Sequence, residues 1–263
     1  MKHAIITGSS RGIGLGIAEE FLRNGFSVTI SGASEKTTNI AKEKLIETYD
    51  SNLILAQKCD VTNYSDLNNL WESTFEKFKR VDIWINNAGV GQNNRNLWEL
   101  TENEVQNIVS INITGMMLGT KLALEKMENQ GFGAIYNMEG FGSDGRMRKK
   151  MSIYGSSKRA LNYFTEGLIS ETKNSKIIIG LISPGMVTTE LLLSATFNDS
   201  NERKSFEKIV NIIGDKVETV SHFLVKEMIK NTKHGKAIRW LTNTKLIIRF
   251  LTYPFSKRNI IDK

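Results

Sequence analysis

A tyrosine and a lysine four residues apart, Tyr154 and Lys158, are the side chains whose types and spacing best suit a chemical role. Positions i and i+4 of a helix lie on one face, so the lysine ammonium is expected beside the tyrosine phenol. A free tyrosine has a pKa near ~10, and a neighbouring cation lowers it by favouring the phenolate. We therefore expect Tyr154 to be a general acid that protonates a developing alkoxide, with Lys158 lowering its pKa. This spacing also occurs on ordinary polar helix faces, so the pair needs support from the rest of the chain.

A glycine-rich turn near the amino terminus predicts a nucleotide site. Residues 4–6 read as a short buried strand, and a helical apolar pattern follows the turn. Glycines let the backbone turn sharply and approach a pyrophosphate, which then lies at the amino-terminal end of a helix. The spacing is GxxxGxG instead of the commoner GxGxxG, but its place between strand and helix is what such a motif requires. The residues expected at the pyrophosphate are Gly8, Ser10, Arg11, Gly12, Ile13 and Gly14.

The remaining pattern alternates strands with helices. Helices are expected between the strands, and Thr101 to Glu104 has a capping-box pattern that begins a long one. Such alternation predicts a single-domain α/β fold of the Rossmann type, a doubly wound parallel sheet of about seven strands flanked by helices. Its ligands are expected beyond the carboxyl ends of the strands. The predicted strands are 4–6, 26–31, 53–59, 81–86, 133–138, 177–182 and 237–241.

Composition is compatible with one globular domain. The chain has 263 residues, of which 40% are apolar, and we expect a catalytic domain over 1–241 followed by a basic, apolar tail over 242–263. The single cysteine, Cys59, excludes an internal disulfide framework and suits a reducing compartment. The first strand begins almost at once, which leaves no room for a signal peptide, and no apolar run approaches the ~20 residues of a membrane span. A cytoplasmic protein is expected.

Over nearly its whole length the chain resembles the classical short-chain dehydrogenase/reductase family. The resemblance implies a nicotinamide-dependent oxidoreductase that passes hydride to a carbonyl carbon, with Asn112, a serine, Tyr154 and Lys158 as its catalytic set. Asn112 would hold a water, and Lys158 would also bind the nicotinamide ribose next to Tyr154. The matching pieces, in order, are residues 7–14, Asp60-Val61, residues 86–89, Asn112, residues 154–158, and Pro184-Gly185 with Thr189.

The same resemblance implies further cofactor contacts. Asp60 and Val61 would contact the adenine, and Asn87 and Gly89 would lie by the adenosine ribose, with Ala88 between them. The resemblance also implies that Val187 and Thr189 would hold the carboxamide. The other residues implied at the cofactor are Pro184 and Gly185.

The choice of cofactor can be argued from charge. Sites for NAD(H) usually carry an acidic residue at the end of the second strand, where it binds the ribose 2′-hydroxyl. That end reads 30-Ile-Ser-Gly-Ala-Ser-34, with no acid at the tip itself, although Glu35 follows. Arg11 and Lys36 can neutralise a 2′-phosphate, and Ser34 can hydrogen-bond to it. We expect NADP(H) to be favoured over NAD(H).

The serine is the point at which the chain departs from the common family pattern. The family's usual position, thirteen residues before the tyrosine, is Phe141, and the nearest hydroxyl is that of Ser143. Glycines around it give the loop freedom to bring that hydroxyl to Tyr154, so Ser143 is the predicted second hydroxyl, with Ser152 as its rival. The run 137–146 and the segment 183–192 are similar to the chlorophyll b reductase branch. That resemblance implies NADPH and a carbonyl on a bulky, partly apolar substrate.

Other functions and partners remain open at this stage. The alternatives are a nucleotide-binding regulatory or scaffold protein that turns over weakly, and a generic reductase of small ketones or 3-oxoacyl thioesters. The scattered histidines His3, His222 and His234 have no ligand spacing, so no metal is expected. The net charge of +7 comes with no nucleic-acid-binding module, so nucleic acid is discounted as a partner. A small-molecule substrate and a homodimer or homotetramer are expected.

The tail contains many large apolar residues between basic ones. They run from Trp240 to Phe255, and the cations among and after them include Lys245, Arg249, Lys257 and Arg258. By family analogy the tail packs on a neighbouring subunit or over the substrate cleft. A basic amphipathic segment can instead make weak peripheral contact with an anionic membrane. A second basic cluster, residues 146–150, leads into the catalytic tyrosine and is read mainly as a solvated loop.

Overall fold

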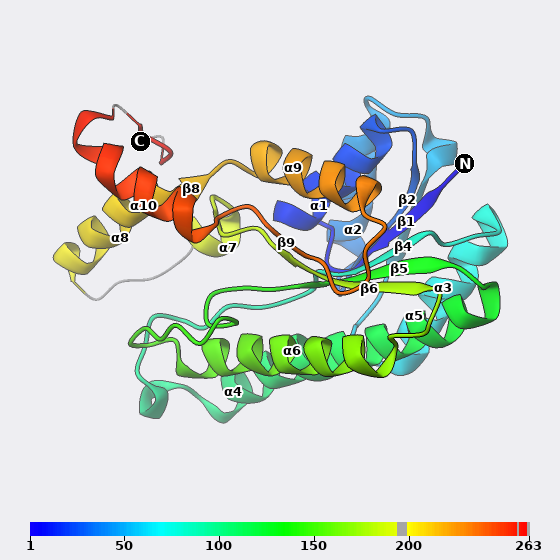
Figure 1. The fold of residues 1–263 in the computed structure, drawn as a ribbon, viewed down its shortest axis with the longest axis horizontal. Coiled ribbons are helices and arrows are strands. Elements are labelled where there is room, and N and C mark those ends of the chain that lie inside the picture. The colour runs from blue at the N-terminus through cyan, green and yellow to red at the C-terminus, as the bar shows by residue number, and fades with distance from the viewer. Residues whose placement is uncertain (194–198, 257, 262–263) are drawn as a thin grey trace.

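The protein is built on one parallel sheet of seven strands in the order β3-β2-β1-β4-β5-β6-β9 (Figure 1). The computed structural model describes residues 1–193, 199–256 and 258–261. All seven predicted strands are present, and the fold class predicted from the sequence is confirmed. The last strand ends at residue 239 instead of 241. The strands are β1 His3–Ile6, β2 Ser27–Gly32, β3 Ile54–Lys58, β4 Ile83–Asn86, β5 Gly133–Met138, β6 Ile177–Ser183 and β9 Ala237–Arg239.

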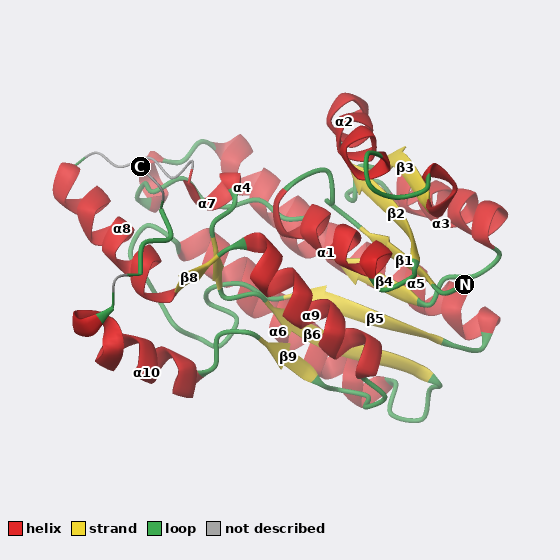
Figure 2. Ribbon diagram, turned by 90° about the horizontal axis from the view of Figure 1, so that it is seen from above, coloured by secondary structure: helices red, strands yellow, loops and turns green. Residues whose placement is uncertain are grey.

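Helices cover both faces of the sheet, as Figures 1 and 2 show. On one face α1, α2 and α9 pack over Ala4 and Ile6, whereas α3 and α5 pack over Ile5 on the other. Successive strand residues point to opposite faces, and both faces are covered, which explains why apolar residues occupy consecutive positions in strands such as β1 and β6. The helices are α1 Gly12–Arg23, α2 Glu35–Ile46, α3 Tyr64–Phe78, α4 Glu102–Val109, α5 Met116–Gln130, α6 Ser152–Glu171, α7 Glu190–Leu193, α8 Ser200–Ile213, α9 Val217–Lys230 and α10 Asn243–Thr252.

The long helix predicted from Thr101 is interrupted. Its capping box is present, because Thr101 Oγ1 accepts from the Glu104 amide and the Glu104 carboxylate accepts from the Thr101 amide at 2.8 Å. After Val109 the chain makes a π-helical turn, Ser110–Gly115, before α5 begins. Such turns are rare in proteins, and those that occur often lie at functional sites. This one carries Asn112. Within the described ranges, short 3₁₀ turns also occur at Ser51–Leu53, Leu97–Glu99 and Tyr253–Phe255.

Two features of the carboxyl-terminal third were not predicted. A second, two-stranded parallel sheet pairs β7, Met186–Val187, with β8, Gly214–Asp215. The tail forms α10, which packs beside α8 on the same side of the molecule as β8 (Figures 1 and 2). The tail's basic residue Lys257 lies outside the described residues. Among the described residues, no helix has the length and apolar character needed to cross a membrane.

Candidate active site

The predicted pair, Tyr154 and Lys158, lies in the first turns of α6. The helix is capped by a residue that the sequence analysis missed, because Gln92 Oε1 accepts from the amides of Ile153 and Tyr154 at 3.0 and 3.2 Å. Gln92 is about sixty residues away in sequence and gives no local signal of this role. Its contacts satisfy amides that the first turn of a helix leaves free, and so hold Tyr154 in place.

Lys158 is buried beneath the tyrosine. Its Nζ lies 5.8 Å from the centre of the Tyr154 ring and donates to the carbonyl oxygen of Met138, at the end of β5, at 3.2 Å. Burial lowers the pKa of Lys158 to about 8, while the negative charge of Glu139 opposes that fall. The ammonium is therefore close to its titration point at neutral to mildly alkaline pH.

The pKa of Tyr154 departs from the expected direction. Its hydroxyl lies so close to Gly140 that a Cβ atom added there would be 2.4 Å from the phenol oxygen and 3.0 Å from Lys158 Cε. Burial in this crowded place raises the pKa of Tyr154 to about 12, so the expected lowering by Lys158 is wrong for this structure. Removing water disfavours the charged phenolate, and the nearby ammonium does not reverse that effect. The phenol is thus a protonated donor.

Asn112 stands on the other side of Lys158. Its Oδ1 accepts from the Val90 amide at 2.8 Å, and its Nδ2 donates to the Val90 carbonyl at 2.9 Å and to Ser157 Oγ at 3.1 Å. A Cβ added to Gly89 would lie 3.3 Å from Asn112 Oδ1 and 3.7 Å from Lys158 Nζ. The π-helical turn, the loop after β4 and the start of α6 therefore bring three of the four predicted catalytic residues together.

Ser143 lies in the loop between β5 and α6. It is buried, its amide donates to the Gly140 carbonyl at 3.2 Å, and its own carbonyl accepts from Arg159 at 2.9 Å. The adjacent Gly142, at φ +97°, packs against the backbone of Gly155. The loop thus brings Ser143 to the first turn of α6, and its role as the second hydroxyl stays a prediction. The side chain of Phe141 and the rival Ser152 are exposed.

The glycine turn forms a tight cradle with the loop after β4. Gly8 has φ +62°, and a Cβ there would lie 2.6 Å from Ala88 Cα; a Cβ on Gly14 would lie 2.4 Å from Asn87 Nδ2. Asn87 Nδ2 also donates to the carbonyls of Thr7 and Gly8 at 2.9 and 2.8 Å. These distances show that Gly8 and Gly14 must be glycines for the turn to pack on the loop after β4, and the turn leads directly into the amino-terminal end of α1, where anionic groups bind favourably. The predicted pyrophosphate site thus has the strand, turn and helix order that such a site requires.

The residues predicted at the 2′-phosphate lie in the glycine turn and at the start of α2. A Cβ on Gly32, the last residue of β2, would touch Ser10 Oγ at 3.0 Å. Ser34 caps α2, where its hydroxyl accepts from the Thr37 amide at 3.4 Å, and Lys36 is exposed in the first turn of that helix. Arg11 is exposed and pairs with Glu190 at 3.3 Å.

Asp60 and Val61 follow β3 on the same edge of the sheet. Asp60 Oδ1 accepts from the amide and the hydroxyl of Thr62 at 2.9 and 2.8 Å, which holds the turn after β3. Val61 is buried against the π-helical turn, where a Cβ on Gly115 would come within 2.6 Å of Val61 Cγ2. The implied adenine contacts therefore lie at the base of the segment that carries Asn112.

The segment from Pro184 to Thr189 reaches the cradle from β6. Gly185 has φ +70° and packs on Leu241, and Val187 pairs with Asp215 in the second sheet. Thr189 approaches the glycine turn, since a Cβ on Gly12 would lie 3.3 Å from Thr189 Cγ2. The two predicted cofactor segments are therefore in direct contact.

A buried carboxylate next to the site was not predicted. Glu139 directly follows β5 and accepts from Arg239 Nε and Nη2, both at 3.1 Å, and from Asn162 Nδ2 at 3.1 Å. Arg239 is in β9, one hundred residues away, so no sequence pattern links the two. Among the described residues, no group of three or more His, Cys, Asp or Glu side chains is placed to hold a metal ion.

Comparison with known proteins gives consistent matches. Residues 2–201 match the family described as short chain dehydrogenase. A probable chlorophyll(ide) b reductase of Oryza sativa subsp. japonica is 33% identical over 95% of this chain, which spans only 52% of that protein. A chlorophyll(ide) b reductase of Arabidopsis thaliana is 33% identical over 92% of this chain and 70% of its own length. The solved structure of ElxO with NADP bound superposes with a TM-score of 0.77 at 25% identity, covering 90% of this chain and 96% of that one.

Proposed function

We propose, because this chain belongs to the short-chain dehydrogenase family, that it is an NADPH-dependent reductase that converts a carbonyl group to an alcohol. One observation supports this most directly. The Tyr154 hydroxyl, Lys158 Nζ and the Asn112 amide meet around Gly89 and Gly140, beside the glycine cradle. The three groups lie at the carboxyl edge of a parallel sheet, where ligands of such folds bind.

The residues of this chain divide the chemistry between them. Bound in the cradle, NADPH would supply the hydride that reaches the carbonyl carbon. Tyr154, protonated because its pKa is raised to about 12, hydrogen-bonds the carbonyl oxygen and donates its proton as negative charge develops there. Ser143 donates a second hydrogen bond to the same oxygen. Lys158 stabilises the resulting phenolate, and Asn112 holds the loop at Val90 and a water that returns the proton.

The preference for NADPH rests on charge. Arg11 in the glycine turn and Lys36 in the first turn of α2 are both exposed cations. A 2′-phosphate would compete with Glu190 for Arg11, and an exposed pair of this kind is held weakly. ElxO was solved with NADP bound, which supports the same choice.

The substrate class follows from the relatives. The chlorophyll(ide) b reductases match this chain over more than nine-tenths of its length, so we propose a carbonyl on a bulky, partly apolar molecule. The chain spans about half the length of the first of them, and the whole relative's activity is carried over only as a proposal. A second candidate is a hydroxysteroid, since a 3alpha-hydroxysteroid dehydrogenase of Mediterraneibacter gnavus is 30% identical over 73% of this chain.

The decisive experiment follows NADPH absorbance against a panel that runs from small ketones through steroid ketones to large ring aldehydes. We expect turnover of a bulky carbonyl, and its loss in Tyr154→Phe with little change in NADPH affinity, because only the proton donor is removed. Turnover retained in that variant contradicts the acid role. Tight NADPH binding with no turnover of any carbonyl favours the regulatory alternative instead.

Assembly and location complete the proposal. An apolar groove of about 570 Å³ runs between α5 and α6, where Met117, Leu118, Leu124, Phe164 and Leu168 line it. We propose that a second copy of the chain covers this groove in a homodimer or homotetramer, because the groove is lined by apolar side chains of both helices and a partner would remove them from water. The exposed residues Ile247, Ile248 and Leu251 of α10 form an apolar surface, on which we base the proposal of weak peripheral membrane contact. A cytoplasmic location is proposed on the free, buried Cys59.

A further inference from the structure

Asp215 is the point at which the carboxyl-terminal tail meets the predicted cofactor segment. Its side chain is buried and accepts from Arg249 at 2.7 and 3.0 Å, from Trp240 Nε1 at 2.6 Å and from Arg258 at 2.6 Å. Although burial works against ionisation, the hydrogen bonds from Arg249 and Trp240 hold the pKa of Asp215 below its usual value. Asp215 therefore stays a carboxylate, and it links two tail arginines to β8.

The backbone of Asp215 faces the opposite way, towards the cofactor segment. Its carbonyl accepts from the Thr188 amide at 3.0 Å and from Thr188 Oγ1 at 3.3 Å, while Val187 pairs with Asp215 across β7 and β8. This two-stranded sheet has only two residues on each side, so its own hydrogen bonds are few. An isolated pair of strands is marginal at best, and the sheet needs support from its surroundings.

The tail supplies that support at several places. Arg249 Nη1 also donates to the Ile213 carbonyl at 2.9 Å, and Arg258 contacts the Gly214 carbonyl. The amides of Ile260 and Ile261 donate to Asn211 Oδ1 at 2.8 and 3.3 Å.

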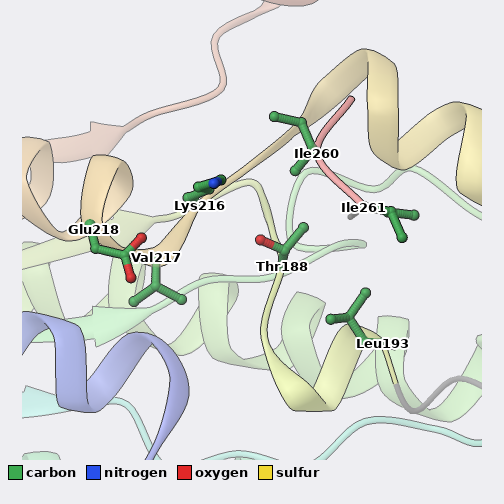
Figure 3. Close-up of a pocket in the computed structure, with 7 residues that line it drawn as sticks. All are labelled: Thr188, Leu193, Lys216, Val217, Glu218, Ile260 and Ile261. Atoms are coloured by element: carbon green, nitrogen blue, oxygen red, sulfur yellow. The ribbon is translucent and has the colours of Figure 1, made fainter. Parts of the chain in front are cut away.

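A small pocket shows how close the tail comes to the cofactor segment. Its volume is about 290 Å³, and in Figure 3 Thr188 lies between the start of α9 and the side chains of Ile260 and Ile261. The tail end and Thr188 thus line the same space, with Leu193 of α7 below them.

We propose that the tail is a latch on the cofactor-binding segment, in which Arg249 and Arg258 act through Asp215 as positioning residues for Val187 and Thr189. With the latch closed, segment 186–189 is already ordered when the cofactor arrives. With the latch open, binding must order that segment as well, and the affinity is reduced to the product of its intrinsic value and the fraction of molecules in which the segment is already ordered. This inference rests on the proposed function, since it takes Val187 and Thr189 as cofactor contacts.

The two arginines do not contribute equally. Arg249 makes two hydrogen bonds to the carboxylate and one to a carbonyl, and its side chain is 13% exposed. Arg258 is 24% exposed, and within the described part of the chain its Nε is buried with no hydrogen-bond partner, which offsets part of what its other contacts contribute. We therefore expect the loss of Arg249 to have the larger effect.

The test replaces Arg249 by glutamine and measures NADPH affinity by fluorescence titration, together with kcat at saturating NADPH. We expect the Kd to rise about tenfold, because hydrogen bonds between charged groups are among the stronger ones, and to rise by more than kcat falls. Arg258→Gln should also raise the Kd for NADPH, but by a smaller factor. Arg249→Lys should have a Kd between those of the parent protein and Arg249→Gln. The matched control is Arg203→Gln, since Arg203 is exposed on α8 and pairs with Glu207 of the same helix, at 3.0 Å.

Hydrogen exchange provides the second readout. The Thr188 amide should exchange faster in Arg249→Gln than in the parent protein, whereas the exchange rates of the β5 amides should be the same in both proteins. A folded Arg249→Gln variant with a lower melting temperature but parental Kd and parental exchange at 186–189 would overturn the latch. If Arg249→Gln does not fold, Arg258→Gln decides by the same criteria. If the parent protein binds no nicotinamide nucleotide, the proposed function fails, and exchange at Thr188 still decides on the latch.

Discussion

Replacing Gly140 by alanine tests the geometry of the proposed acid. The added Cβ would lie 2.4 Å from the Tyr154 hydroxyl and 3.0 Å from Lys158 Cε, whereas ordinary contact begins at 3.4 Å. The phenol oxygen must therefore move by about 1 Å. A displacement of that size in an active site costs roughly a hundredfold in rate, or ~2.7 kcal/mol in the activation free energy. Overpacking also lowers the free energy of unfolding by about 1–3 kcal/mol.

The assay measures kcat, NADPH affinity and the melting temperature of Gly140→Ala beside a matched control. Gly167 lies in the same helix as Tyr154, and a Cβ there meets no atom within 4 Å. Gly167→Ala should keep full activity and gain up to ~1 kcal/mol of stability from its helix propensity. Gly140→Ala should lower kcat by a larger factor than it lowers the NADPH affinity, because Gly140 contacts the proton donor directly and is not part of the glycine turn.

A double variant separates the collision from a general loss of packing. Tyr154→Phe removes the colliding oxygen, so Gly140→Ala should destabilise the phenylalanine background less than the parent protein. Parental turnover in a folded Gly140→Ala protein would refute the reasoning, because it would mean that the position of the Tyr154 hydroxyl beside Gly140 does not matter for proton donation. An equal loss of stability in both backgrounds would show that the phenol oxygen is not what the new methyl group meets.

Three further outcomes are expected. Glu139→Gln should move the alkaline limb of the pH profile of kcat to lower pH. The Lys158 ammonium is lost as the pH rises through its pKa of about 8, and removing the Glu139 carboxylate removes a charge that raises this pKa. An unchanged pH profile would contradict this. Ser143→Ala should lower kcat about a hundredfold with NADPH binding intact, and near-parental turnover would remove Ser143 from the site. Arg11→Ala should narrow the difference between the NADPH and NADH dissociation constants, whereas equal constants in the parent protein would contradict the preference for NADPH.

The sequence was most informative where the structure depends on near neighbours. The seven strands were predicted as apolar runs, and their parallel pairing follows from the alternation with helices. Gly8 and Gly12 have the positive φ values that a sharp turn requires, at +62° and +57°. Tyr154 and Lys158 are adjacent because four residues make about one helical turn. Each of these inferences uses a repeat or a spacing that holds in any protein.

The tertiary structure decided the properties that depend on distant segments. The pKa of Tyr154 rises because Gly140 and its loop enclose the phenol, which the i, i+4 spacing with Lys158 does not reveal. Likewise the Gln92 cap, the Glu139 pair with Arg239 and the contacts of Asp215 join residues tens of positions apart. Desolvation and long-range hydrogen bonds depend on which segments pack together, whereas helical spacing and turn chemistry act within a few residues. The sequence by itself therefore determined which groups are available for chemistry, and the packing of the whole chain decided their protonation and their partners.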